Sequence, residues 1–415
     1  MILQSKIESF VSSKFIRSFT LVELLIVIAI LAVLAAAVVI VLNPAELLAQ
    51  ARDSQRITDL KTLKDAIDIF VVDNPSVSLG TEERVYISLP DTASNCPSLT
   101  ASLPSLPAGW EYVCSTSANL RNTDGTGWVP LNLGSIFGGT PIPYLPLDPQ
   151  NDATLTKYYA YIPGGSYVLT SLMESEKQAK QAAKDGGTDP GRFEVGSDLN
   201  LWTQASGVTA YWDFEEGSGS SLSDRSGNNN NGVWSGTGTY YTTGKVGGYS
   251  GIFTSPNYAD IPDSPTLNSA GALSLIAWIK LSNASTTGYV ITKNTTGSAD
   301  LQYDILHYGT GEYDINLGLN NSAARCSSSN NVVTDSDRWY HVAGVFDGTK
   351  IYLYVDGQQV GLCNYSTPIT QTTHTVNIGR RKPNDIYLGG NVDEMLIFNR
   401  ALTAKEVQAI YNSGK

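Results

Sequence analysis

An apolar run near the amino terminus constrains this chain more than any other feature. Leu24–Leu42 contains 19 consecutive residues without a charged or strongly polar side chain. A helix rises about 1.5 Å per residue, so a run of this length can span a bilayer. Lys6, Lys14 and Arg17 precede it, which places the amino terminus in the cytoplasm. The sequence therefore predicts one membrane-spanning helix with most of the chain exported.

Glu23 lies immediately before this run. A carboxylate at the membrane costs about 3 kcal/mol without a partner, and the run holds no Lys or Arg. Cleavage before Phe19 would supply a cation, because it would expose a new amino group. The alternative is an ordinary secretory signal cut near Ala35-Ala36-Ala37, but such signals have shorter apolar regions of about 7–15 residues. Glu23 favours cleavage before Phe19.

The segment Phe19–Leu31 resembles the start of mature type IV pilins and pseudopilins. In that family a prepilin peptidase removes a short basic leader and methylates the new amino terminus. The resemblance implies cleavage between Ser18 and Phe19, with N-methylation of Phe19. It also implies that Glu23 pairs with the terminal amine of a neighbouring subunit during assembly. Ser18 stands where the family usually has Gly, and without cleavage the chain would be a membrane-anchored surface protein.

The helical pattern continues beyond the apolar run. Residues 52–73 carry apolar side chains at helical spacing: Ile57, Leu60, Leu63, Ile67, Phe70 and Val71. We expect a leader over 1–18 and one transmembrane and assembly helix over 19–73. Pro44 lacks a backbone donor and is expected to kink this helix. Its second half is expected to pack on a small globular domain.

The middle of the chain is expected to form that domain over 74–184, with a small β-sheet. Tyr158–Tyr161 and Ser166–Thr170 alternate on either side of a Pro-Gly-Gly turn, which predicts a hairpin. Leu145–Pro149 precedes the hairpin, an arrangement similar to the end of major pseudopilins. Residues 185–206 begin rich in Gly and charge and are expected to be a linker.

Residues 207–415 have the pattern of many short strands separated by turns. Asp347-Gly348 and Asp356-Gly357 each separate two alternating runs, which predicts hairpins. Thr403 and Glu406 form a capping box before a C-terminal amphipathic helix. The expected fold class is thus α+β, with a long N-terminal helix and a small sheet domain followed by an antiparallel β-sandwich.

Five segments of this region resemble a laminin-G-like (concanavalin A-like) jelly roll, in the same order along the chain. They are Ala210–Gly217, Asp224–Asn228, Trp339–Gly348, Leu353–Gly357 and Val392–Leu402. The resemblance specifies the fold rather than the function, because this sandwich serves carbohydrate binders, protein binders, enzymes and spacers.

Members of this family often hold one structural Ca²⁺, which prefers six to eight oxygen ligands. Asp224, Ser226 and Asn228 place oxygens at alternate positions of a Gly-containing loop, and Asp393 is the matching late residue. The resemblance therefore implies a calcium site at these four residues. The alternative is a polar turn without a metal.

The cysteines indicate an oxidising compartment. They form two separated pairs, Cys96 with Cys114 and Cys326 with Cys363, and neither pair has the Cys-x-x-Cys spacing of a zinc site. Only three His occur in the chain. Two disulfides are the expected outcome.

The sequence does not favour catalysis or nucleic-acid binding. The three-acid strand of glucanases that share this sandwich is approached at Glu312-Tyr313-Asp314-Ile315-Asn316-Leu317, but Leu317 stands in place of the third acid. The net charge of −12 argues against a nucleic-acid partner.

These observations predict a pilin-like subunit of a type IV pilus-type filament that displays a laminin-G-like module for adhesion or recognition of glycan or protein. The alternative is a pseudopilin of a type II secretion or DNA-uptake machine, with the sandwich as tip or spacer. The expected partners are other pilin subunits, a prepilin peptidase and, before assembly, the inner membrane. The chain is expected to be a single-pass cytoplasmic-membrane protein first and a surface filament subunit afterwards.

Overall fold

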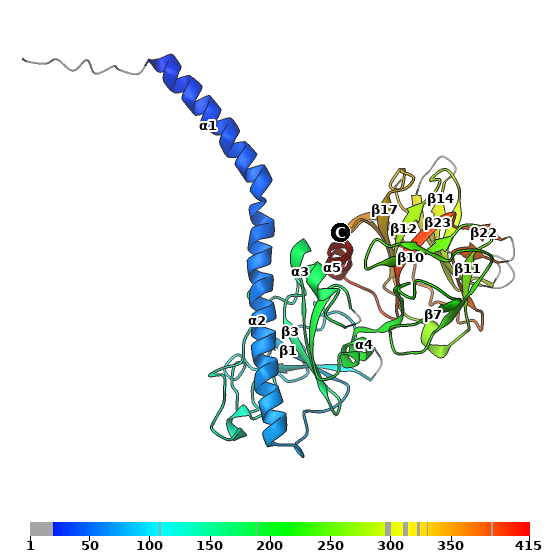
Figure 1. Cartoon of the computed structure of the whole chain (residues 1–415). Coiled ribbons are helices and arrows are strands. Elements are labelled where there is room, and N and C mark those ends of the chain that lie inside the picture. Colours follow the sequence, from blue (N-terminus) through cyan, green and yellow to red (C-terminus); the bar gives the residue numbers. More distant parts are fainter. Residues whose placement is uncertain are drawn as a thin grey trace, which may run out of the picture. The chain divides into compact units, whose positions relative to one another are not determined.

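The computed structural model describes most of the chain. It covers residues 20–107, 109–187, 189–294, 300–309, 314–321, 324–329, 331–382 and 385–415, with only the backbone described for 35–42. The chain divides into two compact units, Met1–Leu48 and Ala49–Lys415 (Figure 1).

The predicted single helix is two helices. α1 (Leu21–Leu42) ends at Asn43, which has a left-handed backbone conformation with φ 39° and ψ 74°, and α2 (Pro44–Asp73) begins at the next residue. The expected kink is therefore a complete break. Proline disfavours the helical conformation at the residue before it, yet fits well at the first position of a new helix.

The membrane-spanning prediction concerns Leu24–Leu42. Among the described residues, no helix has both the length and the hydropathy required to cross a membrane. The predicted span extends into residues 35–42, whose side chains lie outside the described part of the chain.

A five-stranded sheet follows α2, and we call residues 49–206 the sheet domain. Its strand order is β2-β1-β3-β4-β5, with β1 and β2 parallel and the other neighbours antiparallel. The elements are β1 (Arg84–Pro90), β2 (Glu111–Ser115), η1 (Leu133–Ser135), β3 (Tyr159–Pro163), β4 (Tyr167–Leu172), α3 (Glu176–Ala182), β5 (Arg192–Gly196) and α4 (Asn200–Ser206). The predicted hairpin is confirmed as β3 and β4.

One face of α2 packs on this sheet through a mixed core. The buried cluster joins Leu60, Leu63, Ile67 and Phe70 of α2 to Tyr159, Tyr161 and Tyr167 of the hairpin. The tyrosines add polar anchors, since the Tyr159 hydroxyl donates to Asp59 at 2.8 Å. The helical spacing of apolar residues in the sequence thus corresponds to this buried face.

A buried charge network also holds α2. Arg56 has no exposed side-chain surface and binds both carboxylate oxygens of Asp148, at 2.6 and 2.9 Å. It also donates to Asp53 at 2.7 Å and to Glu174. Arg52 is 31% exposed and binds the other side of Glu174 at 2.7 Å. Because the carboxylates come from distant segments, this network ties the helix, the loop before β3 and the segment after β4 together.

The predicted linker over 185–206 is wrong for most of its length. β5 pairs with β4, and Leu201, Trp202 and Ala205 of α4 enter a buried cluster. The Trp202 indole also donates to Asp189 at 3.2 Å. Composition favoured a linker, but an alternating strand and an apolar helix face bury enough surface to order the segment.

Residues 207–415, which we call the sandwich, form two large antiparallel sheets and one small two-stranded sheet. One large sheet has the order β19-β18-β17-β12-β23-β10-β9, with β6 also paired to β23, and the other has the order β16-β15-β14-β13-β20-β11-β8-β7. The elements are β6 (Val208–Trp212), β7 (Ser221–Leu222), β8 (Gly232–Ser235), β9 (Tyr241–Thr243), β10 (Tyr249–Phe253), β11 (Tyr258–Ile261), η2 (Pro265–Leu267), β12 (Leu273–Leu281), β13 (Gly288–Lys293), β14 (Tyr303–Tyr308), β15 (Asp314–Leu319), β16 (Ala324–Ser327), β17 (Trp339–Phe346), β18 (Lys350–Val355), β19 (Gln358–Asn364), β20 (Val376–Ile378), β21 (Arg380–Arg381), β22 (Ile386–Tyr387), β23 (Gly390–Phe398) and α5 (Ala404–Gly414).

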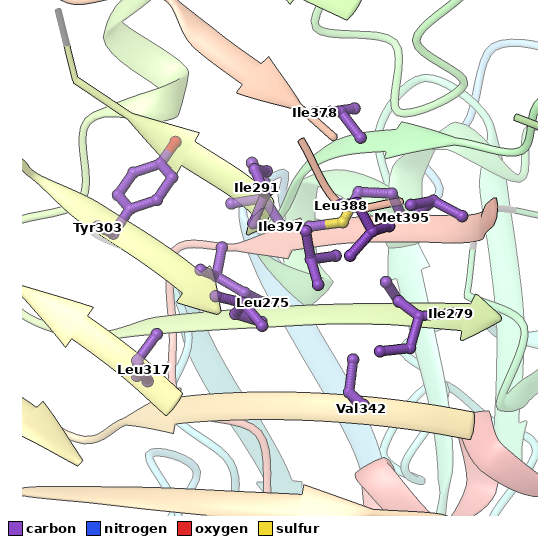
Figure 2. Close-up of a cluster of buried hydrophobic side chains, with 14 of the residues drawn as sticks. Leu275, Ile279, Ile291, Tyr303, Leu317, Val342, Ile378, Leu388, Met395 and Ile397 are labelled. Carbon is purple, nitrogen blue, oxygen red and sulfur yellow. The ribbon is translucent and has the colours of Figure 1, made fainter. Parts of the chain in front are cut away.

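The two sheets enclose one apolar core (Figure 2). Leu275 and Ile279 of β12 and Ile397 of β23 belong to one sheet, whereas Ile291 of β13 and Leu317 of β15 belong to the other. This arrangement is the expected antiparallel sandwich. The two hairpins predicted at the Asp-Gly turns are confirmed as β17–β18 and β18–β19.

Both cysteine pairs form disulfides. Cys96 and Cys114 are joined in the sheet domain, with Cα atoms 5.4 Å apart. Cys326 of β16 and Cys363 of β19 are joined in the sandwich, with Cα atoms 5.7 Å apart. Because these two strands are edge strands of different sheets, the second disulfide links the two layers.

The C-terminal helix α5 joins the sandwich to the sheet domain. Its predicted capping box is confirmed: Thr403 accepts from the Glu406 amide, and Glu406 accepts from the Thr403 amide. Val407 and Ile410 pack on the sandwich, and α5 also lies against α3 (Figure 1). The helix is therefore shared between the two domains.

Candidate functional site

The amino end of α1 carries the predicted assembly residue. The Glu23 carboxylate accepts from both the amide and the hydroxyl of Thr20, each at 2.9 Å, and the Thr20 hydroxyl accepts from the Glu23 amide at 3.2 Å. These bonds form a capping box, which satisfies donors at the helix start. The predicted processing residues Ser18 and Phe19 lie outside the described part of the chain.

This capping box has a recognisable sequence signature, from which it could have been predicted. Thr20-Leu21-Val22-Glu23 has the Thr-x-x-Glu pattern that opens many helices. It provides Glu23 with a partner inside its own chain, so a cation is not its only means of stabilisation. Pairing of Glu23 with the amine of another subunit stays a prediction.

The loop from Asp224 to Asn230 contains three of the four residues predicted to bind calcium. One Asp224 carboxylate oxygen accepts from the amides of Tyr211 and Ser226, both at 2.9 Å. The other accepts from the Ser226 hydroxyl at 2.8 Å and the Asn230 amide at 2.9 Å. Asn228 turns its amide nitrogen toward the carbonyls of residues 208 and 209. The loop is thus closed by its own hydrogen bonds.

Asp393 has other partners. Its carboxylate accepts from the amides of Lys245 at 2.7 Å, Val246 at 3.0 Å and Glu394 at 3.0 Å. The side chain is fully buried, and burial raises the pKa of Asp393 to about 7. None of its hydrogen-bond partners belongs to the loop that contains Asp224.

These donor sets do not fit a calcium ion held jointly by Asp224, Ser226, Asn228 and Asp393. Both oxygens of Asp224 already accept two donors each, and no three His, Cys, Asp or Glu side chains gather into a metal-binding group within the described residues. The calcium site stays a prediction from the sequence.

The substitution Asp224→Asn tests whether the Asp224 carboxylate binds a metal or only accepts the hydrogen bonds that hold its loop. The change leaves the side-chain shape but removes one acceptor, so we expect Asp224→Asn to destabilise the chain by about 1–3 kcal/mol in EDTA and in Ca²⁺ alike. Thermal unfolding of both proteins in the two buffers measures this. A melting temperature of the unmodified chain that rises with Ca²⁺, and does not rise in Asp224→Asn, would restore the calcium interpretation.

The aromatic side chains between residues 234 and 249, which could stack on a sugar ring if exposed, are mostly packed. Trp234 and Tyr241 are buried in the core, and Tyr240 stacks on Trp234 with ring centroids 5.1 Å apart. Tyr249 is 45% exposed. These side chains therefore do not present a joint aromatic surface.

Three consecutive basic residues, 380–382, follow Gly379, and each side chain has a polar or acidic partner. Arg380 binds Asp385 at 3.1 Å and Lys382 binds Asp260 at 3.0 Å. Arg381 donates to the Tyr289 hydroxyl at 2.7 Å. Such pairing fits a structural role for the triplet.

The strand considered for catalysis is part of the sandwich wall. Asp314 and Asn316 of β15 are buried, and Asn316 accepts from Ser327 at 2.5 Å. Glu312 lies outside the described residues.

Two segments of the chain match known protein families. Residues 14–39 match the prokaryotic N-terminal methylation motif, and residues 253–408 match the concanavalin A-like lectin/glucanases superfamily. The chain therefore joins a prepilin-type methylation motif to a laminin-G-type, concanavalin A-like domain. The predicted fusion is confirmed.

Several solved structures are similar to part of the chain. Domain 4 of AbnA, an extracellular GH43 arabinanase from Geobacillus stearothermophilus solved with arabinotriose, is 21% identical with a TM-score of 0.41, covering 49% of this chain and 97% of that one. The binding domains of Paraclostridial Mosquitocidal Protein 1 (14% identity) and of botulinum neurotoxin DC in complex with rat synaptotagmin II (13% identity) both have TM-scores of 0.40 and cover 50% of this chain. The chain spans about half, 52%, of the length of these two. No protein of curated function matches the chain.

Proposed function

We propose that the chain is a pilin-like subunit of a type IV pilus-type surface filament and that its sandwich is a recognition module. The observation that carries this proposal is the union of a prepilin methylation motif with a concanavalin A-like domain in one chain. The motif belongs, in general, to precursors that are anchored in the membrane and then assembled. The domain type includes many binders of glycans or proteins, and this supports a role in recognition.

The sheet domain supports the pilin part of the proposal. A long helix packs with one face on an antiparallel hairpin, and the Leu145–Pro149 loop precedes that hairpin. The same loop is the feature that favours the second candidate, a pseudopilin of a secretion or DNA-uptake machine. Isolation of surface filaments that contain the chain would separate the two candidates.

The amino terminus of the assembled chain tests the assembly proposal. Mass spectrometry of sheared filaments is expected to show a chain that begins at N-methylated Phe19. Glu23→Ala is expected to be cleaved normally but to reduce the filament-bound fraction at least about tenfold, because the carboxylate that pairs with the neighbouring amine is lost.

Glu82→Ala is a suitable control, since Glu82 is an exposed acid outside the helices. It is expected to leave both cleavage and assembly unchanged. An intact Met1, or a chain that starts near Val38, would overturn the filament proposal and favour an anchored or secreted protein.

A further inference from the structure

A cavity of about 500 Å³ lies where the sheet domain meets the sandwich. α4 supplies one wall, including Asn200, Thr203 and Gln204, and the sandwich supplies Asn228 and Asn399. Small-molecule sites in proteins commonly occupy about 300–1,000 Å³ and often lie at domain interfaces. We call this space the junction cavity.

The walls of the junction cavity are held in place by hydrogen bonds among residues of the lining and their neighbours. The Asn228 amide nitrogen donates to the carbonyls of Val208 and Thr209 at 3.3 and 3.2 Å. The Asn399 backbone amide donates to the Gly207 carbonyl at 2.9 Å, and Arg400 donates to Ser206. Both domains therefore contribute fixed backbone to the site, which lowers the ordering cost of binding a ligand.

Gly207 lines the junction cavity beside Asn399. Its φ of 76° lies in the left-handed region that glycine adopts at low cost, and a Cβ atom there would lie 2.6 Å from the Asn399 side-chain oxygen. A larger residue would displace the Asn399 side chain.

The chemistry of the lining indicates a neutral, hydroxyl-rich ligand. The side-chain amides of Gln204 and Asn399 are exposed and bond to no described residue. Each amide offers donors and an acceptor, which complements hydroxyl groups that both donate and accept. Among the described lining residues none is charged, so a phosphate or carboxylate would lack a counter-charge. The apolar side chains are limited to Pro107 and Val208, which offer little area to an apolar ligand.

We propose that the junction cavity binds a neutral oligosaccharide and that both domains contribute to recognition. The proposal deepens the proposed recognition function and rests on it. It places the ligand at the boundary with the sheet domain and not on an aromatic face of the sandwich. Gln204 and Asn399 are the residues that make hydrogen bonds to the ligand from opposite domains.

The test uses the full chain purified in a mild detergent. It is first applied to an array of neutral and acidic oligosaccharides of three to six units, and the strongest neutral oligosaccharide is then titrated by calorimetry. The double variant Gln204→Ala/Asn399→Ala is expected to bind at least about tenfold more weakly, since two direct hydrogen bonds are lost. Asn399→Trp, which fills the cavity, is expected to abolish binding. Thermal melting of each variant checks that the fold is retained.

Gln181→Ala is the matched control, because Gln181 is an exposed amide on α3 away from the cavity, and its affinity is expected to stay unchanged. Unchanged binding by the double variant and by Asn399→Trp would overturn the junction site while leaving a recognition function intact. Binding of acidic glycans or of protein ligands alone would overturn the ligand class. A chain that binds no glycan would also overturn the inference, and the filament proposal would still be decided by the amino-terminal mass.

Discussion

Arg56→Met is expected to lower the free energy of unfolding by about 3–5 kcal/mol, the cost of leaving buried carboxylates without their partner. Arg56 is fully buried and bonds to Asp53, Asp148 and Glu174, which come from α2, the loop before β3 and the segment after β4. Methionine fills a similar volume but supplies neither a charge nor a donor. Chemical denaturation followed by circular dichroism measures the change.

Arg52→Met is the matched control for this prediction. Arg52 lies on the same helix and binds the same Glu174, but its side chain is 31% exposed. Surface ion pairs contribute about 0–1 kcal/mol, so the control is expected to stay within that range. Equal effects of the two variants would show that burial of Arg56 does not set the cost.

The charge network around Glu174 is also expected to make the free energy of unfolding depend on pH in the acid range. Burial alone would raise the pKa of Glu174, but hydrogen bonds from Arg52 and the charge of Arg56 outweigh it and lower that pKa to about 2, from an ordinary value of 4.5. A carboxylate with a lowered folded-state pKa stabilises the fold fully above its unfolded pKa. That contribution is therefore expected to be lost as pH falls from about 4.5 through about 2. The loss should be smaller in Arg56→Met than in the unmodified chain.

The second large effect concerns the contact between the two domains. Glu406→Gln is expected to lower the free energy of unfolding by about 3–5 kcal/mol, because it removes the carboxylate that pairs with the buried Arg400 guanidinium and lies beside the buried Arg192. Glu406 binds the Arg400 guanidinium at 2.8 and 3.1 Å and lies 3.9 Å from Arg192. Arg192 is fully buried; its guanidinium makes no hydrogen bond within the described residues and also lies 3.5 Å from the Asp189 carboxylate. The amide keeps the shape of Glu406 but not its charge.

Glu176→Gln is the matched control, because it removes the charge of an exposed carboxylate in an ion pair between α3 and the end of α5. Glu176 pairs with Lys415 between α3 and the end of α5, and its side chain is 41% exposed. Its replacement is expected to cost at most about 1 kcal/mol. Limited proteolysis gives a second readout: Glu406→Gln should open residues 185–206 to cleavage at lower protease concentration. A variant as stable and as resistant as the unmodified chain would contradict the proposed role of Glu406.

The capping box at Glu23 shows what short sequence patterns can predict about the structure. The Thr-x-x-Glu spacing alone predicts the capping box that the structure contains, because a helix start depends on residues three apart. The same reasoning correctly predicted the start of α5 from Thr403 and Glu406. Cleavage and methylation depend on a peptidase, so a match to the methylation motif supports them without showing them.

The calcium prediction shows what such patterns leave open. Asp224, Ser226 and Asn228 have the spacing of oxygen ligands, but spacing does not reveal which donors reach each oxygen. In the folded chain, backbone amides from Tyr211 and Asn230 occupy Asp224. A carboxylate that closes a loop and one that binds a metal can thus have the same sequence neighbourhood.

The sequence by itself determined the methylation motif, the antiparallel sandwich, the Asp-Gly hairpins and the capping box of α5. Each depends on side-chain periodicity or on groups a few residues apart. Only the tertiary structure decided that 185–206 is ordered, that α5 is shared by two domains and that an uncharged cavity lies beside α4. These features depend on Arg192, Glu406 and Asn399 meeting distant partners, and the free energy of such contacts arises only when the complete chain brings the groups together and excludes water from them.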